Sequence, residues 1–449
     1  MNTRNRLTAT TKVGESKGNK RIWLESQRLS AIGFLPGEAF RTLFDVDSGV
    51  LILETHLFGE RRVSSRKRKL KSGSIEVPVI DLCNADLTDF IGPHQRVQVD
   101  YFDGRIEVRI HHEDLAIMER ESRFSRNIQK GSIKTGTIAS GAGISTAAVH
   151  DGLMERGLES HCQWMVDVDP RYLEIADRNN HAVTPETHLY VGTVEEMQAG
   201  KMEKVDLVNV SLACDIHASC GKAKKGLKYA EEDSSITSVF GLISVIRSVN
   251  PSIVVSENVT EAMTSTTYML IRAELRRLGY RISEAILDES HGACLETRRR
   301  YWMVAVSEGL PDVAFDDFPI PEKRFHCVGD VLETEDIPEF RKYAYLDEKE
   351  KRDIAAGKGF RQNKVTAQST VVGTLGKGYA KVRSTEPRLT GIDDKSRLFS
   401  VTESCRLRGI PEHLVADCGF TIGHEAAGQS ILYNHGVGIG KLIADALTA

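Results

Sequence analysis

Residues 135–145 read TGTIASGAGIS, and this stretch decides the fold of the longer part of the chain. An apolar strand pattern runs into a turn that contains Gly141 and Gly143, and a helical pattern follows. Glycine lets the backbone turn sharply and approach a ligand, and the start of a helix offers free N–H groups. The stretch therefore predicts the first strand, turn and helix of an α/β fold, with Ser140, Gly141 and Gly143 as candidate cofactor-binding residues.

The chain that follows alternates between short strands and helices. Helical spacing of apolar residues separates several of the strand patterns, which fall at 164–168, 189–191, 205–210, 252–255, 281–286 and 301–306. This alternation predicts a doubly wound, mostly parallel sheet of the Rossmann-like type. Ligands of such open sheets bind where the strands end.

The second strand ends in two carboxylates, Asp167 and Asp169, with Val168 between them. Asp169 is expected to cap the next helix, which leaves Asp167 as the candidate for ribose hydroxyls. A dinucleotide-binding dehydrogenase would carry GxGxxG, but Thr146 stands at the third glycine position. The glycine turn and the carboxylate of Asp167 together fit S-adenosylmethionine. This cofactor has a ribose that needs a carboxylate, but it lacks the pyrophosphate of a dinucleotide.

Three strand ends carry reactive side chains. Cys214 comes just after one apolar strand, with Cys220 as a rival, and a lysine-rich loop follows that would lower the pKa of the thiol. Glu257 follows the next strand. Arg298 and Arg300 precede the last strand and face the same way if they are extended. Taken alone, the cysteine is best interpreted as a buried, unreactive thiol, and the glutamate and the arginines as partners in salt bridges. Their positions at neighbouring strand ends favour instead one shared catalytic crevice.

These residue types suit methylation of a pyrimidine at C5. A thiolate that adds to C6 makes C5 nucleophilic. A carboxylic acid at N3 and a guanidinium at O2 would accept the electron density that builds up in the ring.

The order of these elements resembles the DNA cytosine-5 methyltransferase family. The matching segments are 139–143 for FxGxG, 213–214 for PC, 257–259 for ENV, 296–300 for QxRxR, 401–411 for the segment that ends in glycine, an apolar residue and proline, and 428–431 for GNSV. The chain departs from the pattern at Ala139, Ala213, Thr193, Glu296 and Gln429, and none of these changes removes a reactive atom.

The resemblance implies S-adenosylmethionine-dependent methylation of cytosine C5 in duplex DNA, with the base turned out of the helix. It makes Cys214 the nucleophile, Glu257 the N3 partner and Arg300, together with Arg298, the contact to O2. The implied cofactor-binding residues are Ser140, Gly141, Gly143, Asp167, Val168, Thr193, Gln429 and Ser430. The same chemistry on structured RNA, or a catalytically silent DNA-binding regulator, remains an alternative.

The domain organisation is predicted from changes in the pattern along the chain. It comprises a mobile arm at 1–20, a small antiparallel β domain at 21–112, a connector at 113–130, a catalytic domain at 131–310, a target-recognition region at 311–389 and a returning C-terminal segment at 390–449. The basic run at 61–71 is expected on a hairpin tip or loop, where it would contact DNA phosphates.

Composition limits the other function classes. The 449 residues carry a net charge of −4, so DNA contacts must come from local basic patches. The eight cysteines form no CxxC pair, His291 and Cys294 lack a second ligand pair, and no metal site is assigned. The absence of a long apolar run predicts a cytoplasmic protein. The expected partners are duplex DNA and a cognate restriction endonuclease, and a monomer would suffice.

Overall fold

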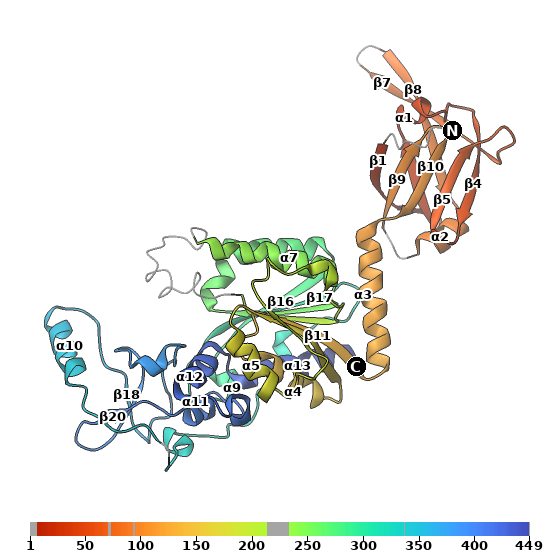
Figure 1. Ribbon diagram of the computed structural model, residues 1–449. Helices are drawn as coiled ribbons and strands as arrows, with labels where there is room; N and C mark the ends of the chain where they lie inside the picture. Colours follow the sequence, from red (N-terminus) through yellow and green to blue (C-terminus); the bar gives the residue numbers. More distant parts are fainter. Residues whose placement is uncertain (1–6, 71–72, 93–94, 213–232, 336, 449) are drawn as a thin grey trace. The chain divides into compact units, whose positions relative to one another are not determined.

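The computed structural model describes residues 7–70, 73–92, 95–212, 233–335 and 337–448 (Figure 1). The chain divides into two compact units, Met1–Glu119 and Arg120–Ala449. Among the described residues, no helix has both the length and the apolar character that a membrane crossing requires.

The first unit consists of two antiparallel sheets around a core of aliphatic side chains that includes Ile22, Leu53 and Ile106. A six-stranded sheet has the order β1-β9-β10-β5-β4-β6, and a four-stranded sheet has the order β2-β3-β8-β7. The strands are β1 (Leu7–Lys12), β2 (Gly14–Ser16), β3 (Asn19–Glu25), β4 (Ala39–Asp45), β5 (Val50–Thr55), β6 (Arg61–Arg62), β7 (Ser64–Leu70), β8 (Gly73–Cys83), β9 (Arg96–Phe102) and β10 (Arg105–Ile110), and the helices are α1 (Arg28–Ala31) and α2 (Ala85–Ile91).

Two segments of this unit differ from the sequence-based expectation. The expected mobile arm is a strand from Leu7 on, because β1 pairs with β9 and Thr8 Oγ1 donates a hydrogen bond to Asp100 Oδ1 at 2.5 Å. The basic run lies largely within strand β7, which pairs with β8, rather than on a loop. Alternation along β7 brings Arg66 and Arg68 to Glu25, at 3.5 Å and 2.6 Å.

The second unit is built on a seven-stranded sheet with the order β13-β12-β11-β14-β15-β17-β16. Its strands are β11 (Ser132–Ile138), β12 (Glu159–Asp167), β13 (His188–Val191), β14 (Leu207–Val210), β15 (Ile253–Asn258), β16 (Tyr280–Leu287) and β17 (Arg300–Ser307). Strands β11 to β15 pair in parallel, whereas β17 runs antiparallel to both of its neighbours. The predicted doubly wound, mostly parallel sheet is confirmed.

Helices cover both faces of this sheet (Figure 1). Alternate side chains of β15 explain the two layers: Ile253 and Val255 pack with α4 (Ile144–Met154), α5 (Pro170–Asn179) and α13 (Tyr433–Thr448), while Val254 packs with α7 (Ser238–Val249) and α8 (Thr266–Arg277). The strands are thus buried on both faces, which explains their continuous apolar pattern.

Helix α3 (His112–Gln129) occupies most of the expected connector. Its last turns belong to the second unit, where Arg120 Nε donates to Ser307 Oγ at 2.8 Å and Arg123 Nε lies 3.2 Å from Asp206 Oδ1. Both arginines also donate to backbone carbonyls, which fixes this part of α3 against the ends of the inner strands β14 and β17.

The chain after β17 forms a loop-rich region with a small core of its own, which includes Val328, Val365 and Leu389. Its elements are η6 (Phe315–Asp317), η7 (Val328–Val331), α10 (Ala344–Ala355), β18 (Lys364–Val365), η8 (Tyr379–Lys381), β19 (Arg388–Thr390) and β20 (Ser396–Arg397). Helices α11 (Val401–Leu407) and α12 (Phe420–Gln429) and the turn η9 (Glu412–Val415) then lead to α13. The functional domain boundaries stay predictions.

Candidate functional site

The glycine turn has the backbone conformation that its residues predict. Gly141 and Gly143 have φ values of +52° and +72°, and Ala139, at the position of the family's aromatic residue, has +53°. A Cβ atom on Gly143 would lie 2.4 Å from Asn180 Nδ2, which itself donates to the Gly143 carbonyl at 2.8 Å. Glycine is therefore required here for conformation and for space.

Asp167 holds this turn at the end of β12. One carboxylate oxygen accepts a hydrogen bond from the Gly141 amide at 2.7 Å and the other from the Asp169 amide at 2.9 Å. Asp169 caps α5 by accepting from the Arg171 amide, as the sequence predicts. Each Asp167 oxygen keeps a lone pair that can accept from a ribose hydroxyl. Val168 is 64% exposed beside it, so its side chain is free to contact a ligand.

Two further segments carry expected cofactor residues. Thr193 follows β13, and its amide donates to Glu196 Oε2 at 2.9 Å. The sequence analysis did not single out Glu196, which places a carboxylate beside Thr193. Gln429 ends α12, and its Nε2 lies 2.9 Å from where a Cβ atom of Gly141 would stand. The side chain of Ser430 donates to the Ala427 carbonyl at 2.8 Å. The end of α12 thus returns to the glycine turn.

Glu257 and Arg300 meet at the end of β15. Arg300 Nε lies 2.9 Å from Glu257 Oε1, and Ser211 Oγ donates to Glu257 Oε2 at 3.4 Å. Burial raises the pKa of the Glu257 carboxyl group despite the opposing charge of Arg300. The end of β15 therefore combines a buried acid of raised pKa with a fixed cation.

The expected nucleophile Cys214, and its rival Cys220, lie outside the described residues. The chain is described as far as Leu212, whose carbonyl accepts a hydrogen bond from Asn258 Nδ2 at 2.9 Å. The Ser211 amide donates to the Ile138 carbonyl at 3.2 Å. These bonds fix the end of β14 beside the residue that follows Glu257, two positions before the cysteine in sequence.

Arg298 makes different direct contacts from Arg300, although its charge also opposes the rise in the pKa of Glu257, and the catalytic role expected for it stays a prediction. Its guanidinium is 1% exposed, lies 2.9 Å from Glu296 Oε1 and donates to the carbonyls of Gly428 and Ser430. Glu296 also pairs with Arg408 at 2.5 Å. Arg298 therefore ties the approach to β17 to the turn at the end of α12. The sequence analysis did not predict that Glu296 pairs with two buried arginines, although Glu296 begins the segment 296–300 that matched QxRxR.

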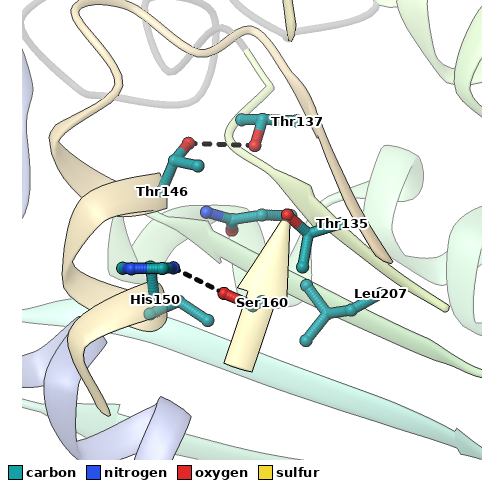
Figure 2. A pocket seen from close by; sticks show the side chains of 8 residues that line it. Thr135, Thr137, Thr146, His150, Ser160 and Leu207 are labelled. Atoms are coloured by element: carbon teal, nitrogen blue, oxygen red, sulfur yellow. Dashed lines mark hydrogen bonds between the residues drawn. The ribbon is translucent and has the colours of Figure 1, made fainter. Parts of the chain in front are cut away.

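A small polar pocket lies between α4 and the strands β11, β12 and β14 (Figure 2). Its polar groups largely bind one another: the hydroxyls of Thr137 and Thr146 are 2.9 Å apart, and His150 Nδ1 lies 2.7 Å from Ser160 Oγ. Its lining includes Leu207 and Ser160, which lie at or near the starts of β14 and β12, away from the expected site at the carboxyl ends of the strands. It belongs to the packing of α4 on the sheet and contains none of the expected site residues.

Comparison with known sequences agrees with this arrangement. Residues 137–433 match the family described as C-5 cytosine-specific DNA methylase. The Type II methyltransferase M.MspI of Moraxella sp is 24% identical over 283 residues, which are 60% of this chain and 62% of that protein. The Type II methyltransferase M.DsaV of Dactylococcopsis salina is 25% identical over 240 residues, which are 51% and 66%. The chain thus spans less than two thirds of the length of these relatives.

Solved structures share the fold. The S. pombe Dnmt2 methyltransferase has a TM-score of 0.55 at 18% identity, and the match covers 70% of this chain and 99% of that one. The Entamoeba histolytica methyltransferase EhMeth has a TM-score of 0.58 at 14% identity, with coverages of 70% and 98%. Because the family match covers residues 137–433, about two thirds of the chain, this chain belongs to the C-5 cytosine-specific DNA methylase family.

Proposed function

We propose that this protein transfers a methyl group from S-adenosylmethionine to C5 of cytosine in duplex DNA. The observation that carries the proposal is the buried pair of Glu257 and Arg300, 2.9 Å apart at the end of β15, beside the strand end that leads to Cys214. Membership of the methylase family supports the same reaction.

The residues around the glycine turn fit S-adenosylmethionine. Asp167 offers carboxylate lone pairs to ribose hydroxyls, and Gly141 and Gly143 keep the turn free of side chains. Ser140, Val168, Thr193, Gln429 and Ser430 would complete the binding site. Bound there, S-adenosylmethionine supplies an electrophilic methyl group.

The protein's part in the reaction is to make C5 nucleophilic. The Cys214 thiolate adds to C6 of the base, and the ring electrons move towards N3 and O2. Glu257 gives its proton to N3, which its raised pKa favours, and the Arg300 guanidinium donates to O2. C5 then bonds to the methyl group, whose bond to sulfur breaks, and loses its hydrogen as a proton. The electron pair of that C–H bond restores the C5–C6 double bond and expels the thiolate, and N3 returns its proton to Glu257.

A cytosine stacked in duplex DNA cannot reach a buried acid, so the base would be turned out of the helix. We assign recognition of the target sequence to the loop-rich region at 311–389. The first unit would contact phosphates through β7, where Lys67 and Lys69 are exposed and form no ion pair within the described residues. The Type II names of the relatives favour a restriction-modification role, with a cognate endonuclease as partner and this chain acting as a monomer.

The direct test is nucleoside mass spectrometry of duplex DNA incubated with the protein and S-adenosylmethionine. Wild type and Cys220→Ala should form 5-methylcytosine, and Cys214→Ala should form none. Binding of S-adenosylmethionine, measured by calorimetry, should be unchanged in Cys214→Ala. If structured RNA is modified while DNA is not, the proposed substrate is wrong. If Cys214→Ala still methylates DNA, the proposed nucleophile is wrong.

A further inference from the structure

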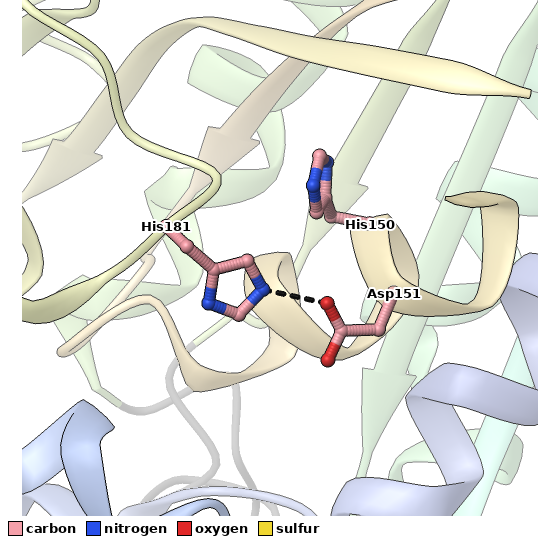
Figure 3. A group of neighbouring side chains, drawn as sticks. All are labelled: His150, Asp151 and His181. Carbon is pink, nitrogen blue, oxygen red and sulfur yellow. Dashed lines mark hydrogen bonds and ion pairs between the residues drawn. The ribbon is translucent and has the colours of Figure 1, made fainter. Parts of the chain in front are cut away.

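Three side chains outside the proposed catalytic site gather close together in the second unit, two of them half-buried and the third exposed. His150 and Asp151 lie on α4, and His181 lies just after α5 (Figure 3). One potential ligand atom from each lies within 4.8 Å of the others, and His181 Nε2 is 2.6 Å from Asp151 Oδ1. Two of these residues are neighbours in the sequence and the third lies thirty positions later. Metal-binding motifs do not have this spacing, so the cluster is visible only in the folded structure.

Each member of this His150-Asp151-His181 cluster has a second polar atom that is already held from outside the cluster. His150 Nδ1 lies 2.7 Å from Ser160 Oγ, and Asp151 Oδ2 accepts from Tyr433 Oη at 2.5 Å. His181 Nδ1 lies 3.2 Å from His413 Nε2. Outer hydrogen bonds of this kind set the tautomer and orientation of imidazole and carboxylate groups that bind metals.

We propose that the His150-Asp151-His181 cluster binds a divalent transition-metal ion, with Zn²⁺ as the expected occupant. Two imidazoles and one carboxylate form a ligand set that suits Zn²⁺. Ligand atoms of a tetrahedral site stand roughly 3.4 Å apart when the bonds are about 2.1 Å long. His181 Nε2 and Asp151 Oδ1 would separate slightly, and the remaining atoms would move inwards. These movements are open to the cluster, because the side chains of His181 and Asp151 are 36% and 30% exposed.

The place of the cluster in the fold gives the metal a structural role. Helix α4 starts at the glycine turn, and Asp151 is held by Tyr433 of α13, while His181 contacts His413 of η9. A bound ion would join α4 to the segment after α5 and fix its orientation relative to α13. The ion would thus stiffen the helix whose first turn forms the proposed cofactor site.

The alternative is an ion pair of His181 and Asp151 that binds no metal. Equilibrium dialysis of the full chain, stripped with a chelator and then exposed to Zn²⁺ alone, distinguishes the two. His181→Ala and His150→Ala should each bind one equivalent less than wild type. His161→Ala is the matched control, because His161 is a nearby exposed histidine outside the cluster, and it should bind as wild type does. Equal stoichiometry in all four proteins would overturn the proposal.

Two further measurements do not depend on stoichiometry. Co²⁺ bound at this site should show d–d absorption without the charge-transfer band of a cysteine ligand, and His181→Ala should abolish that absorption. Zn²⁺ at about 100-fold excess over its Kd should raise the Tm of wild type by about 3–8 °C and leave that of His181→Ala unchanged. A sulfur charge-transfer band in place of the expected spectrum, or an equal Tm response in both proteins, would overturn the assignment. Circular dichroism confirms that each variant is folded.

Discussion

Arg300 Nε lies 2.9 Å from Glu257 Oε1, yet the pKa of the Glu257 carboxyl group is raised rather than lowered. Burial is the largest cause, because a charged carboxylate loses its hydration at a position that is only 7% exposed. The guanidinium opposes this effect without cancelling it. The pair therefore holds a proton donor and a fixed cation side by side, which is the arrangement that the proposed attack on cytosine requires.

The raised pKa of Glu257 predicts an alkaline limit to activity. The protonated acid is the active form, so kcat/KM should fall as pH rises through the raised pKa. Glu257→Gln cannot transfer a proton and should lower kcat by about 10²–10⁴-fold and remove that limb of the profile. The measurement is the initial rate of methylation against pH, with the exposed Glu261→Gln as control. An unchanged profile in Glu257→Gln would exclude Glu257 as the acid.

The two arginines of the segment 296–300 should respond differently to the same substitution. Arg298→Met removes one partner of a buried network and leaves Glu296 with less compensation, so the free energy of unfolding should fall by about 3–5 kcal/mol. Arg300→Met should change stability less, because Glu257 can stay protonated, but should lower kcat/KM strongly.

Urea unfolding and steady-state kinetics of the two variants, measured in parallel, test this assignment. A large loss of stability in Arg300→Met with near-normal kinetics would reverse the two roles.

These arginines also show where sequence reasoning ends. Their spacing suggests a shared direction only if both lie in a strand, but β17 begins at Arg300 and Arg298 precedes it. Strand alternation therefore does not apply, and contacts with residues 375, 428 and 430 decide where Arg298 points. Such contacts join segments more than 70 positions apart, and no local pattern reports them.

Features that depend only on residues close together in the sequence were predictable. The glycine turn, the cap by Asp169 and the position of Glu257 at a strand end depend on residues within a few positions of each other. The strand β1 was missed because its stability depends on pairing with β9, about 90 residues later. The His150-Asp151-His181 cluster was missed because its members come from separate helices and loops.

The glycine turn allows a matched test of conformation and space. Gly143 and Gly157 have nearly equal φ values of +72° and +75°, but only at Gly143 would a Cβ atom collide with a neighbour, Asn180. Gly157→Ala should cost about 1 kcal/mol through the backbone alone. Gly143→Ala should cost more, at about 2–4 kcal/mol, and should weaken binding of S-adenosylmethionine. Thermal unfolding and calorimetry measure both effects, and equal costs at the two sites would contradict the predicted contact.

The basic residues of strand β7 alternate between its two faces and differ in their ion pairs. All four side chains are exposed, but Arg66 and Arg68 pair with Glu25 whereas Lys67 and Lys69 form no ion pair within the described residues. If β7 contacts phosphates, the double variant Lys67→Gln with Lys69→Gln should weaken DNA binding and reduce the slope of log K against log salt by about 2. The corresponding arginine double variant should have a smaller effect. Affinity measured at several salt concentrations tests this, and an unchanged slope in the lysine variant would rule out the contact.

The buried histidine His435 predicts a loss of stability in acid. It is 0% exposed and lies 2.7 Å, through Nε2, from the carbonyl of Asp288, and burial lowers its pKa to about 4. The unfolded chain takes up this proton near pH 6.5, so the unfolded state gains stability as pH falls from about 6.5 to 4. The shift corresponds to about 3 kcal/mol across that range. His435→Gln keeps a hydrogen-bond donor but does not titrate, so its free energy of unfolding should depend less on pH by that amount. The exposed His188→Gln is the control, and a pH dependence equal to wild type in His435→Gln would show that His435 is not the group responsible.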